Sequence, residues 1–251
     1  MTTILSKHEP FGIHQTDQIL ANDQHLQDWN AELTPKIRKY AIDRLTKVLL
    51  PQQIARIASD GMLDRRVVPL ILGDLFALTE RDPATGSDPF MVWDCYLSLK
   101  AVANYRIANA IYYPPHRLWA DTYNFQRAAR KLSEKTKVET GVEIHPGANI
   151  GQRCIIDHGM GTVIGETTKI GNDAYILQCV ILGGRKIAGN VLGQRHPIIG
   201  NNVEIGGFAR IFGSVTICND VFISPHAVIE HDVPGNSRVV VKTTNQIIIN
   251  H

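Results

Sequence analysis

An aspartate and a histidine, Asp157 and His158, stand side by side in the stretch IDHGMGTVIGE of residues 156–166. An imidazole exchanges protons near neutral pH, and a carboxylate can fix its orientation, so a histidine in such company could act as a general base. The rest of the stretch is mainly aliphatic residues and glycine. The residues alone leave a second interpretation open, in which the pair is a surface turn that caps nearby backbone groups.

The surroundings of this pair repeat every six residues. Aliphatic side chains recur at that spacing, and the position four residues after each is often small or aliphatic as well; the uninterrupted run comprises Ile199, Ile205, Ile211, Ile217, Ile223 and Ile229. A period of six fits neither an α-helix nor an alternating strand, and it is typical of a parallel β-helix. We therefore predict a β-helix over residues 141–235, with about four coils that each rise by about 4.8 Å.

The repeat breaks once, between residues 183 and 198, in the sequence GGRKIAGNVLGQRHPI. A segment without the six-residue register must leave the coil, so we expect an extruded loop that ends in Arg195 and His196. Loops on a rigid scaffold often carry function, although a polar pair in a loop is also consistent with simple solvation.

The repeat also predicts where the pair at 157–158 points. Ile156 takes the inward position, which leaves Asp157 and His158 on turn or outward positions. Glu143 belongs to the first repeat and precedes the inward Ile144, so its carboxylate could lie near the imidazole of His158 and orient it.

The first half of the chain has a helical period instead. Residues 1–30 show little pattern, and we interpret them as a loose arm or a short helix. Residues 31–140 predict a helical domain whose first helix has Thr34 as its N-cap and Pro35 as its first residue. Further helices are expected to begin at Pro51 and near Pro69, the latter ending before Pro83, followed by two more over 94–113 and 117–136. Residues 236–251 are expected to form a tail.

Composition limits the possible partners and the compartment. The formal net charge is +2, which gives no strong attraction to nucleic acid or to a membrane, and no apolar run approaches the roughly 20 residues that span a bilayer. The N-terminal residues lack the pattern of a signal peptide. Four widely spaced cysteines fit a reducing cytoplasm, with the two among aliphatic residues expected to be buried: Cys95, Cys154, Cys179 and Cys218.

These motifs together resemble a known family. The series EIHPGANIG, DHGMGTVIGET, ILQCVILGG and RHPIIGNNVEIG, with RDPA and YRIANAI in the helical half, is similar to the serine O-acetyltransferases, a family of hexapeptide-repeat acyltransferases. The resemblance implies a left-handed β-helix that uses acetyl-CoA as co-substrate, and we expect no metal. It also implies trimers with active sites between subunits, and two trimers joined through the helical domains.

The resemblance also assigns roles to individual residues. His158 matches the general base that takes the proton from the serine hydroxyl, and Glu143 stands where the family has the aspartate that orients this base. Asp157 and Asp82 match residues that hold the substrate. Arg195 and His196 match the pair that engages the substrate carboxylate, a task that suits a guanidinium. Four glycines match backbone positions along the pantetheine slot: Gly183, Gly184, Gly206 and Gly207.

The chain departs from the family pattern at Glu143, in DHGMG, in a longer 183–198 loop and in the residues after the last repeat. It ends in Asn250-His251 rather than isoleucine, so we do not expect docking to cysteine synthase. The predicted function is acetyl transfer from acetyl-CoA to L-serine in the cytoplasm. The alternatives are another acceptor, such as homoserine or D-serine, a non-catalytic scaffold, and a γ-carbonic-anhydrase-like metalloenzyme that uses His226 and His231.

Overall fold

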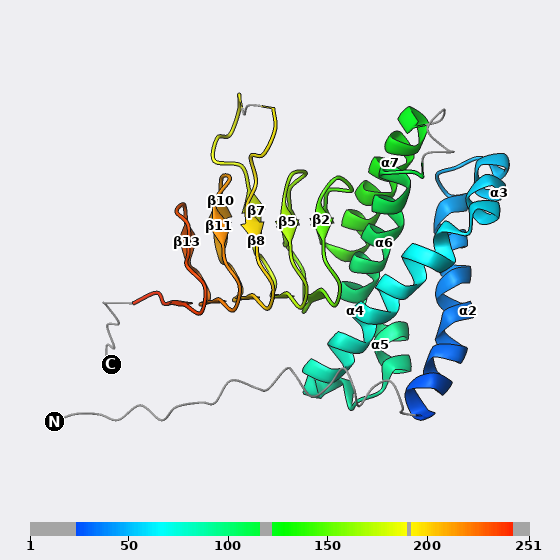
Figure 1. Cartoon of the computed structure of the whole chain (residues 1–251), viewed down its shortest axis with the longest axis horizontal. Coiled ribbons are helices and arrows are strands. Elements are labelled where there is room, and N and C mark those ends of the chain that lie inside the picture. Colours follow the sequence, from blue (N-terminus) through cyan, green and yellow to red (C-terminus); the bar gives the residue numbers. More distant parts are fainter. Residues whose placement is uncertain (1–23, 116–121, 190–191, 243–251) are drawn as a thin grey trace, which may run out of the picture.

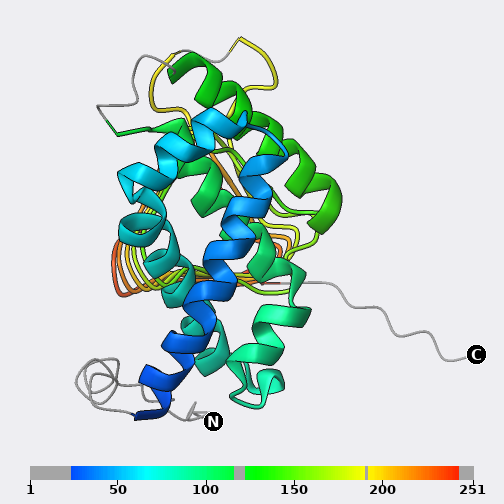
Figure 2. The ribbon, with the colours of Figure 1, turned by 90° about the vertical axis from the view of Figure 1, so that its right-hand side faces the viewer.

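The computed structural model describes residues 24–115, 122–189 and 192–242. A group of packed helices is followed by a narrow stack of coils (Figure 1). Viewed along the stack, the helices lie across one end of it (Figure 2). This arrangement confirms the expected fold class, an N-terminal helical region followed by a left-handed parallel β-helix.

The helical region contains six α-helices in the part of the chain described, with a π-helical turn at Leu63–Val67 and a 3₁₀ turn, η3, at Pro83–Thr85. Helix α3 begins at Pro51 and α4 ends at Arg81, before Pro83, as predicted. The α-helices are α2 Gln24–Thr46, α3 Pro51–Asp60, α4 Val68–Arg81, α5 Pro89–Cys95, α6 Leu97–Tyr112 and α7 Thr122–Thr140.

The predicted start of the first helix is wrong. Helix α2 begins at Gln24, inside the region expected to lack pattern, and it runs through Pro35. Proline inside a helix removes one hydrogen bond and costs about 3 kcal/mol. Leu33, before the proline, is as fully buried as Ile37 after it, so one apolar face continues across the proline and its burial offsets that cost.

The β-helix consists of short parallel strands in three sheets. Sheet A has the order β1-β4-β7-β10-β13, sheet B β2-β5-β8-β11 and sheet C β3-β6-β9-β12-β14. The strands are β1 Glu143–Ile144, β2 Asn149–Ile150, β3 Ile155–Ile156, β4 Val163–Ile164, β5 Lys169–Ile170, β6 Tyr175–Ile176, β7 Ile181–Gly183, β8 Ile198–Ile199, β9 Glu204–Ile205, β10 Arg210–Phe212, β11 Thr216–Ile217, β12 Phe222–Ile223, β13 Val228–Ile229 and β14 Arg238–Val239.

The six-residue repeat sets the register of these strands. In sheet A the inward residues of successive strands pair directly, and all are buried: Ile144, Ile164, Leu182, Ile211 and Ile229. The expected small residues at the fourth position are buried too, from Val203 to Val233. Strand β14 lies beyond residue 235, where we had placed the end of the β-helix.

The chain leaves the stack between β7 and β8, and the loop projects from the side of the coils (Figure 1). The expected extrusion at 183–198 is therefore present, with residues 190–191 outside the described part. Ile187 and Leu192 in this loop are fully exposed. Cys154 is buried, as expected, and burial raises the pKa of its thiol to about 12, whereas Cys179 is only half-buried. No helix in the described ranges is long and apolar enough to cross a membrane.

A buried ion pair fastens the helices to the first coil. Arg106 of α6 donates to both carboxylate oxygens of Asp74 in α4, at 2.8 and 2.9 Å. The same guanidinium donates to the carbonyl oxygens of Ile150 and Gly151, each at 2.6 Å, and Asp74 accepts from the backbone N–H of Cys154. Both side chains are almost completely buried, and three of these hydrogen bonds join the helices to residues 150–154 of the first coil.

Candidate active site

Each coil turns at three corners, and the predicted residues gather at two of them. We call the corner between sheets C and A the C–A corner, formed by residues 157–162, 177–180, 206–209 and 224–227. We call the corner between sheets A and B the A–B corner, formed by residues 145–148, 165–168, 184–197 and 213–215. Sheet A separates these two corners within one chain.

His158 lies at the C–A corner, in the turn between β3 and β4. Its φ of 58° is left-handed, and its side chain is 70% exposed, so the imidazole is displayed outside the coil as predicted. Asp157 is only 14% exposed, and its Oδ2 lies 3.7 Å from Nε2 of His158. The two side chains therefore face each other at the surface.

Two tyrosines connect Asp157 with Asp82. The hydroxyl of Tyr175 in β6 donates to Oδ2 of Asp157 at 2.9 Å, and the hydroxyl of Tyr96 donates to Oδ2 of Asp82 at 3.1 Å. Asp82 follows α4, and its other oxygen accepts from the backbone N–H of Ala84. Burial, and then the charges of both aspartates, raise the pKa of each tyrosine. The structure thus brings Asp82 and Asp157 into one acidic cluster beside His158.

Glu143 is not paired with His158 in this structure. Its Oε2 lies 2.5 Å from Nζ of Lys137, and its Oε1 lies 3.6 Å from a guanidinium nitrogen of Arg130. Both cations belong to α7, which packs on β1. The expected contact with the imidazole is replaced by these two ion pairs.

Arg195 and His196 lie at the A–B corner. The guanidinium of Arg195 pairs with the carboxylate of Glu166, which lowers the pKa of that carboxyl. Nδ1 of His196 accepts from the backbone N–H of Thr167 at 3.1 Å, and its ring fills the space that a side chain at Gly165 would occupy. Burial and the neighbouring Arg195 lower the pKa of His196.

The four predicted glycines are divided in the same way. Gly183 ends β7 and Gly184 follows it into the A–B corner, whereas Gly206 and Gly207 lie at the C–A corner. A Cβ on Gly206 would lie 2.5 Å from the backbone nitrogen of Pro225 in the next coil, so only glycine fits there without a shift.

Each corner therefore carries only part of the predicted site. His158, Asp157, Asp82 and one glycine pair lie on one side of sheet A, and Arg195, His196 and the other glycine pair lie on the other side. A substrate that touched both sets would have to lie between two copies of the chain.

Three residues of the two corners were not among the predicted site residues: Tyr175, Tyr96 and Glu166. The repeat carried a signal for Tyr175, because the residue before each inward isoleucine of sheet C points out of the coil. Tyr175 is such a residue, and it pairs with Ile155 in one neighbouring coil and with Glu204 in the other. Glu166 belongs to the motif DHGMGTVIGET. Its ion pair with Arg195 could not be predicted, because it depends on how the extruded loop returns to the stack.

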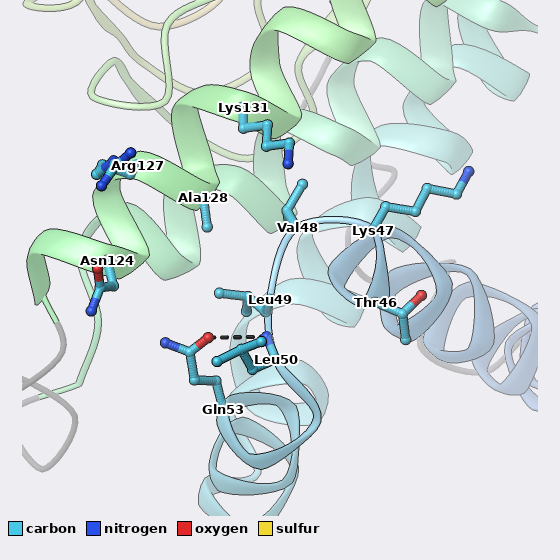
Figure 3. A pocket seen from close by; sticks show the side chains of 10 residues that line it. All are labelled: Thr46, Lys47, Val48, Leu49, Leu50, Gln53, Asn124, Arg127, Ala128 and Lys131. Atoms are coloured by element: carbon cyan, nitrogen blue, oxygen red, sulfur yellow. Dashed lines mark hydrogen bonds between the residues drawn. The ribbon is translucent and has the colours of Figure 1, made fainter.

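Two further features lie outside this cluster. His226, one of the two residues considered as metal ligands, stacks on Phe208 with ring centroids 5.0 Å apart. Among the residues that the structure describes, no group of three or more His, Cys, Asp or Glu side chains is arranged to hold a metal ion. A pocket between α7 and the connection from α2 to α3 contains none of the predicted site residues (Figure 3).

A parallel β-helix built on hexads, with an imidazole and a carboxylate displayed at one corner, defines this chain as a hexapeptide-repeat acyltransferase. Residues 138–248 match the family model described as the GMPPB C-terminal domain. A serine acetyltransferase of Mycobacterium tuberculosis is 42% identical over 180 residues, which cover 70% of this chain and 71% of the relative. The chain belongs to the serine acetyltransferase family.

Solved structures agree with this assignment. The serine acetyltransferase of Vibrio cholerae matches with a TM-score of 0.69 and 27% identity, over 90% of this chain and 86% of the other. The Neisseria gonorrhoeae serine acetyltransferase in complex with serine matches with a TM-score of 0.67 and 28% identity, over 92% and 93% of the two chains.

Proposed function

We propose that this protein transfers the acetyl group of acetyl-CoA to the hydroxyl of L-serine, with His158 as the general base. The observation that carries this proposal is the exposed imidazole beside the acidic cluster of Asp157 and Asp82, in a chain of this family. His158 takes the proton of the serine hydroxyl as that oxygen attacks the thioester carbon. The carbon–sulfur bond then breaks, and the proton passes to the departing thiolate of CoA.

The charges at the two corners suit the two charged ends of an amino acid. Asp157 and Asp82 together can hold the ammonium group of serine. Arg195 and His196, supplied by a second subunit, can hold its carboxylate, with the guanidinium as a planar, bidentate donor. Gly183 and Gly184 on one subunit, with Gly206 and Gly207 on the other, can line the pantetheine arm of acetyl-CoA.

We infer from this division that the active unit is a trimer. Three subunits related by a threefold axis bring the C–A corner of each against the A–B corner of the next, and each contact completes one site. The helical region, residues 31–140, lies at one end of the coils and is free to join two such trimers into a hexamer. We place the reaction in the cytoplasm.

The acceptor is tested by measuring thiol release from acetyl-CoA with L-serine, D-serine, L-homoserine and L-threonine. We expect the highest kcat/KM for L-serine, because the ammonium and carboxylate sites fix both the chirality of the acceptor and the reach of its hydroxyl. A higher kcat/KM for another of these acceptors would assign the enzyme to that substrate. Absence of thiol release with all of them would overturn the proposed function.

Arg195→Lys is expected to raise KM for serine by about tenfold, because an ammonium cannot reproduce two parallel hydrogen bonds to a carboxylate. KM for acetyl-CoA should stay near its original value. Steady-state kinetics with each substrate varied in turn measure both constants. Equal changes for both substrates would show that Arg195 does not hold the acceptor.

A further inference from the structure

We propose that Asp157, held in place by Tyr175, is the carboxylate partner of His158 in this chain, in place of Glu143. Tyr175 is then a positioning residue for the catalytic base. This inference rests on the proposed function in one respect, the role of His158 as general base.

Glu143 already has cationic partners and is not available to His158. Both of its oxygens face cations of α7, Lys137 at 2.5 Å and Arg130 at 3.6 Å, and its side chain is only 23% exposed. Turning this carboxylate toward His158 would break the short contact to Lys137 and leave that ammonium without its nearest counter-charge. The extra methylene of glutamate gives it the reach to make these contacts with α7.

Asp157, in contrast, lies between Tyr175 and His158. A single oxygen, Oδ2, lies 2.9 Å from the hydroxyl of Tyr175 and 3.7 Å from Nε2 of His158. A carboxylate beside Nε2 favours the tautomer with its proton on that nitrogen, which leaves Nδ1 free to accept the proton of the substrate hydroxyl. The same negative charge stabilises the imidazolium that forms when the base takes up that proton. Oδ1 stays available for the ammonium group of the acceptor.

The ring of Tyr175 is itself held in place by Arg81. Arg81, at the end of α4, lies 4.8 Å above its ring and pairs with Glu204 at 2.6 Å. Burial and the neighbouring Asp157 raise the pKa of the Tyr175 phenol, so the hydroxyl keeps its proton and donates throughout the neutral range. The phenol therefore holds Asp157 from the outer face of sheet C.

Other titratable groups face this pair from the elements around it. The hydroxyl of Tyr96, before α6, donates to Asp82, after α4. Asp157 lies close enough for its negative charge to contribute to the raised pKa of Tyr96. Cys95, the neighbour of Tyr96, is exposed, and Cys179 lies at the next turn of the C–A corner. Asp82 therefore adds a second carboxylate to the tyrosines around Asp157.

The test is Tyr175→Phe, which keeps the ring and removes only the hydroxyl. We expect kcat for serine acetylation to fall by about tenfold, the effect of losing one hydrogen bond to a charged group. We also expect the acidic limb of the pH–rate profile to move to lower pH, because Asp157 is no longer held beside the imidazolium, which is then deprotonated more easily. Tyr40→Phe is the matched control, since it removes a hydroxyl bonded to Asn104 among the helices.

Two outcomes overturn the inference. The first is a Tyr175→Phe enzyme with the same acidic limb as the original, even if its melting temperature falls. The second is a Glu143→Gln enzyme whose acidic limb moves at least as far as that of Tyr175→Phe, which would return the role to Glu143. Failure of the proposed function looks different, because the unaltered enzyme would then release no thiol.

Discussion

Replacement of His158 by alanine is expected to lower kcat for serine acetylation by about 10²–10⁴-fold, the range typical for loss of a positioned general base. The side chain is 70% exposed and lies in a turn outside the buried isoleucine ladder, so its removal leaves the packing of the coils intact. Thiol release, circular dichroism and the measured mass of the assembly together check this result. A variant with near-normal turnover would remove His158 from the mechanism.

A mixing experiment provides the companion test, because the two halves of the site lie on different corners. His158→Ala and Arg195→Ala subunits are each expected to be nearly inactive alone. When they are unfolded, mixed in equal amounts and refolded, about one site in four should combine a C–A corner that retains His158 with an A–B corner that retains Arg195. Activity should therefore return to about a quarter of the original. No recovery, with trimers present, would show that each site lies within one subunit.

Replacement of Arg106 by methionine is expected to lower the free energy of unfolding by about 3–5 kcal/mol, the usual cost of breaking a buried ion pair on one side. The variant leaves the carboxylate of Asp74 buried without its cation, and it removes two hydrogen bonds to carbonyl groups of the first coil. Urea unfolding followed by circular dichroism measures the change.

Arg38→Met is the control for this prediction. Arg38 pairs with Asp64 at 3.1 Å, but both side chains are about half exposed, so its loss should cost less than about 1 kcal/mol. Similar losses for the two variants would contradict the role of Arg106 as the fastening between helices and coils. The double variant Asp74→Leu with Arg106→Met should recover part of the stability, because no charge is then left buried alone.

The β-helix could be predicted from the sequence because its core is periodic in the chain itself. An isoleucine at every sixth position must face the axis of the stack, and this fixes the register of the strands and the outward position of His158. The first helix was predicted to begin too late in the chain because Pro35 is a strong local signal for a helix start. The burial of Leu33 before it is a tertiary effect that outweighs the local one.

The partners of the site residues could not be predicted in the same way. Glu143 was expected near His158, but its contacts depend on how α7 packs against β1, and no local pattern encodes that packing. The pairing of Arg195 with Glu166 likewise depends on the return of a loop that has no repeat. Tyr175 was also missed, although its regular position in the repeat predicts that its side chain lies on the outer face of sheet C.

The helices at one end of the coils also limit how copies of this protein could associate through strand edges. Parallel coils expose backbone N–H and C=O groups at any uncovered end, and such edges can template the growth of fibrils. Here α6 and α7 pack against β1, so helices cover this end of the stack, whereas β11, β13 and β14 are the last strands at the opposite end of the described coils. Each unit inside a fibril pairs through two edges, so a stack that is covered at one end can join at most one other stack, end to end.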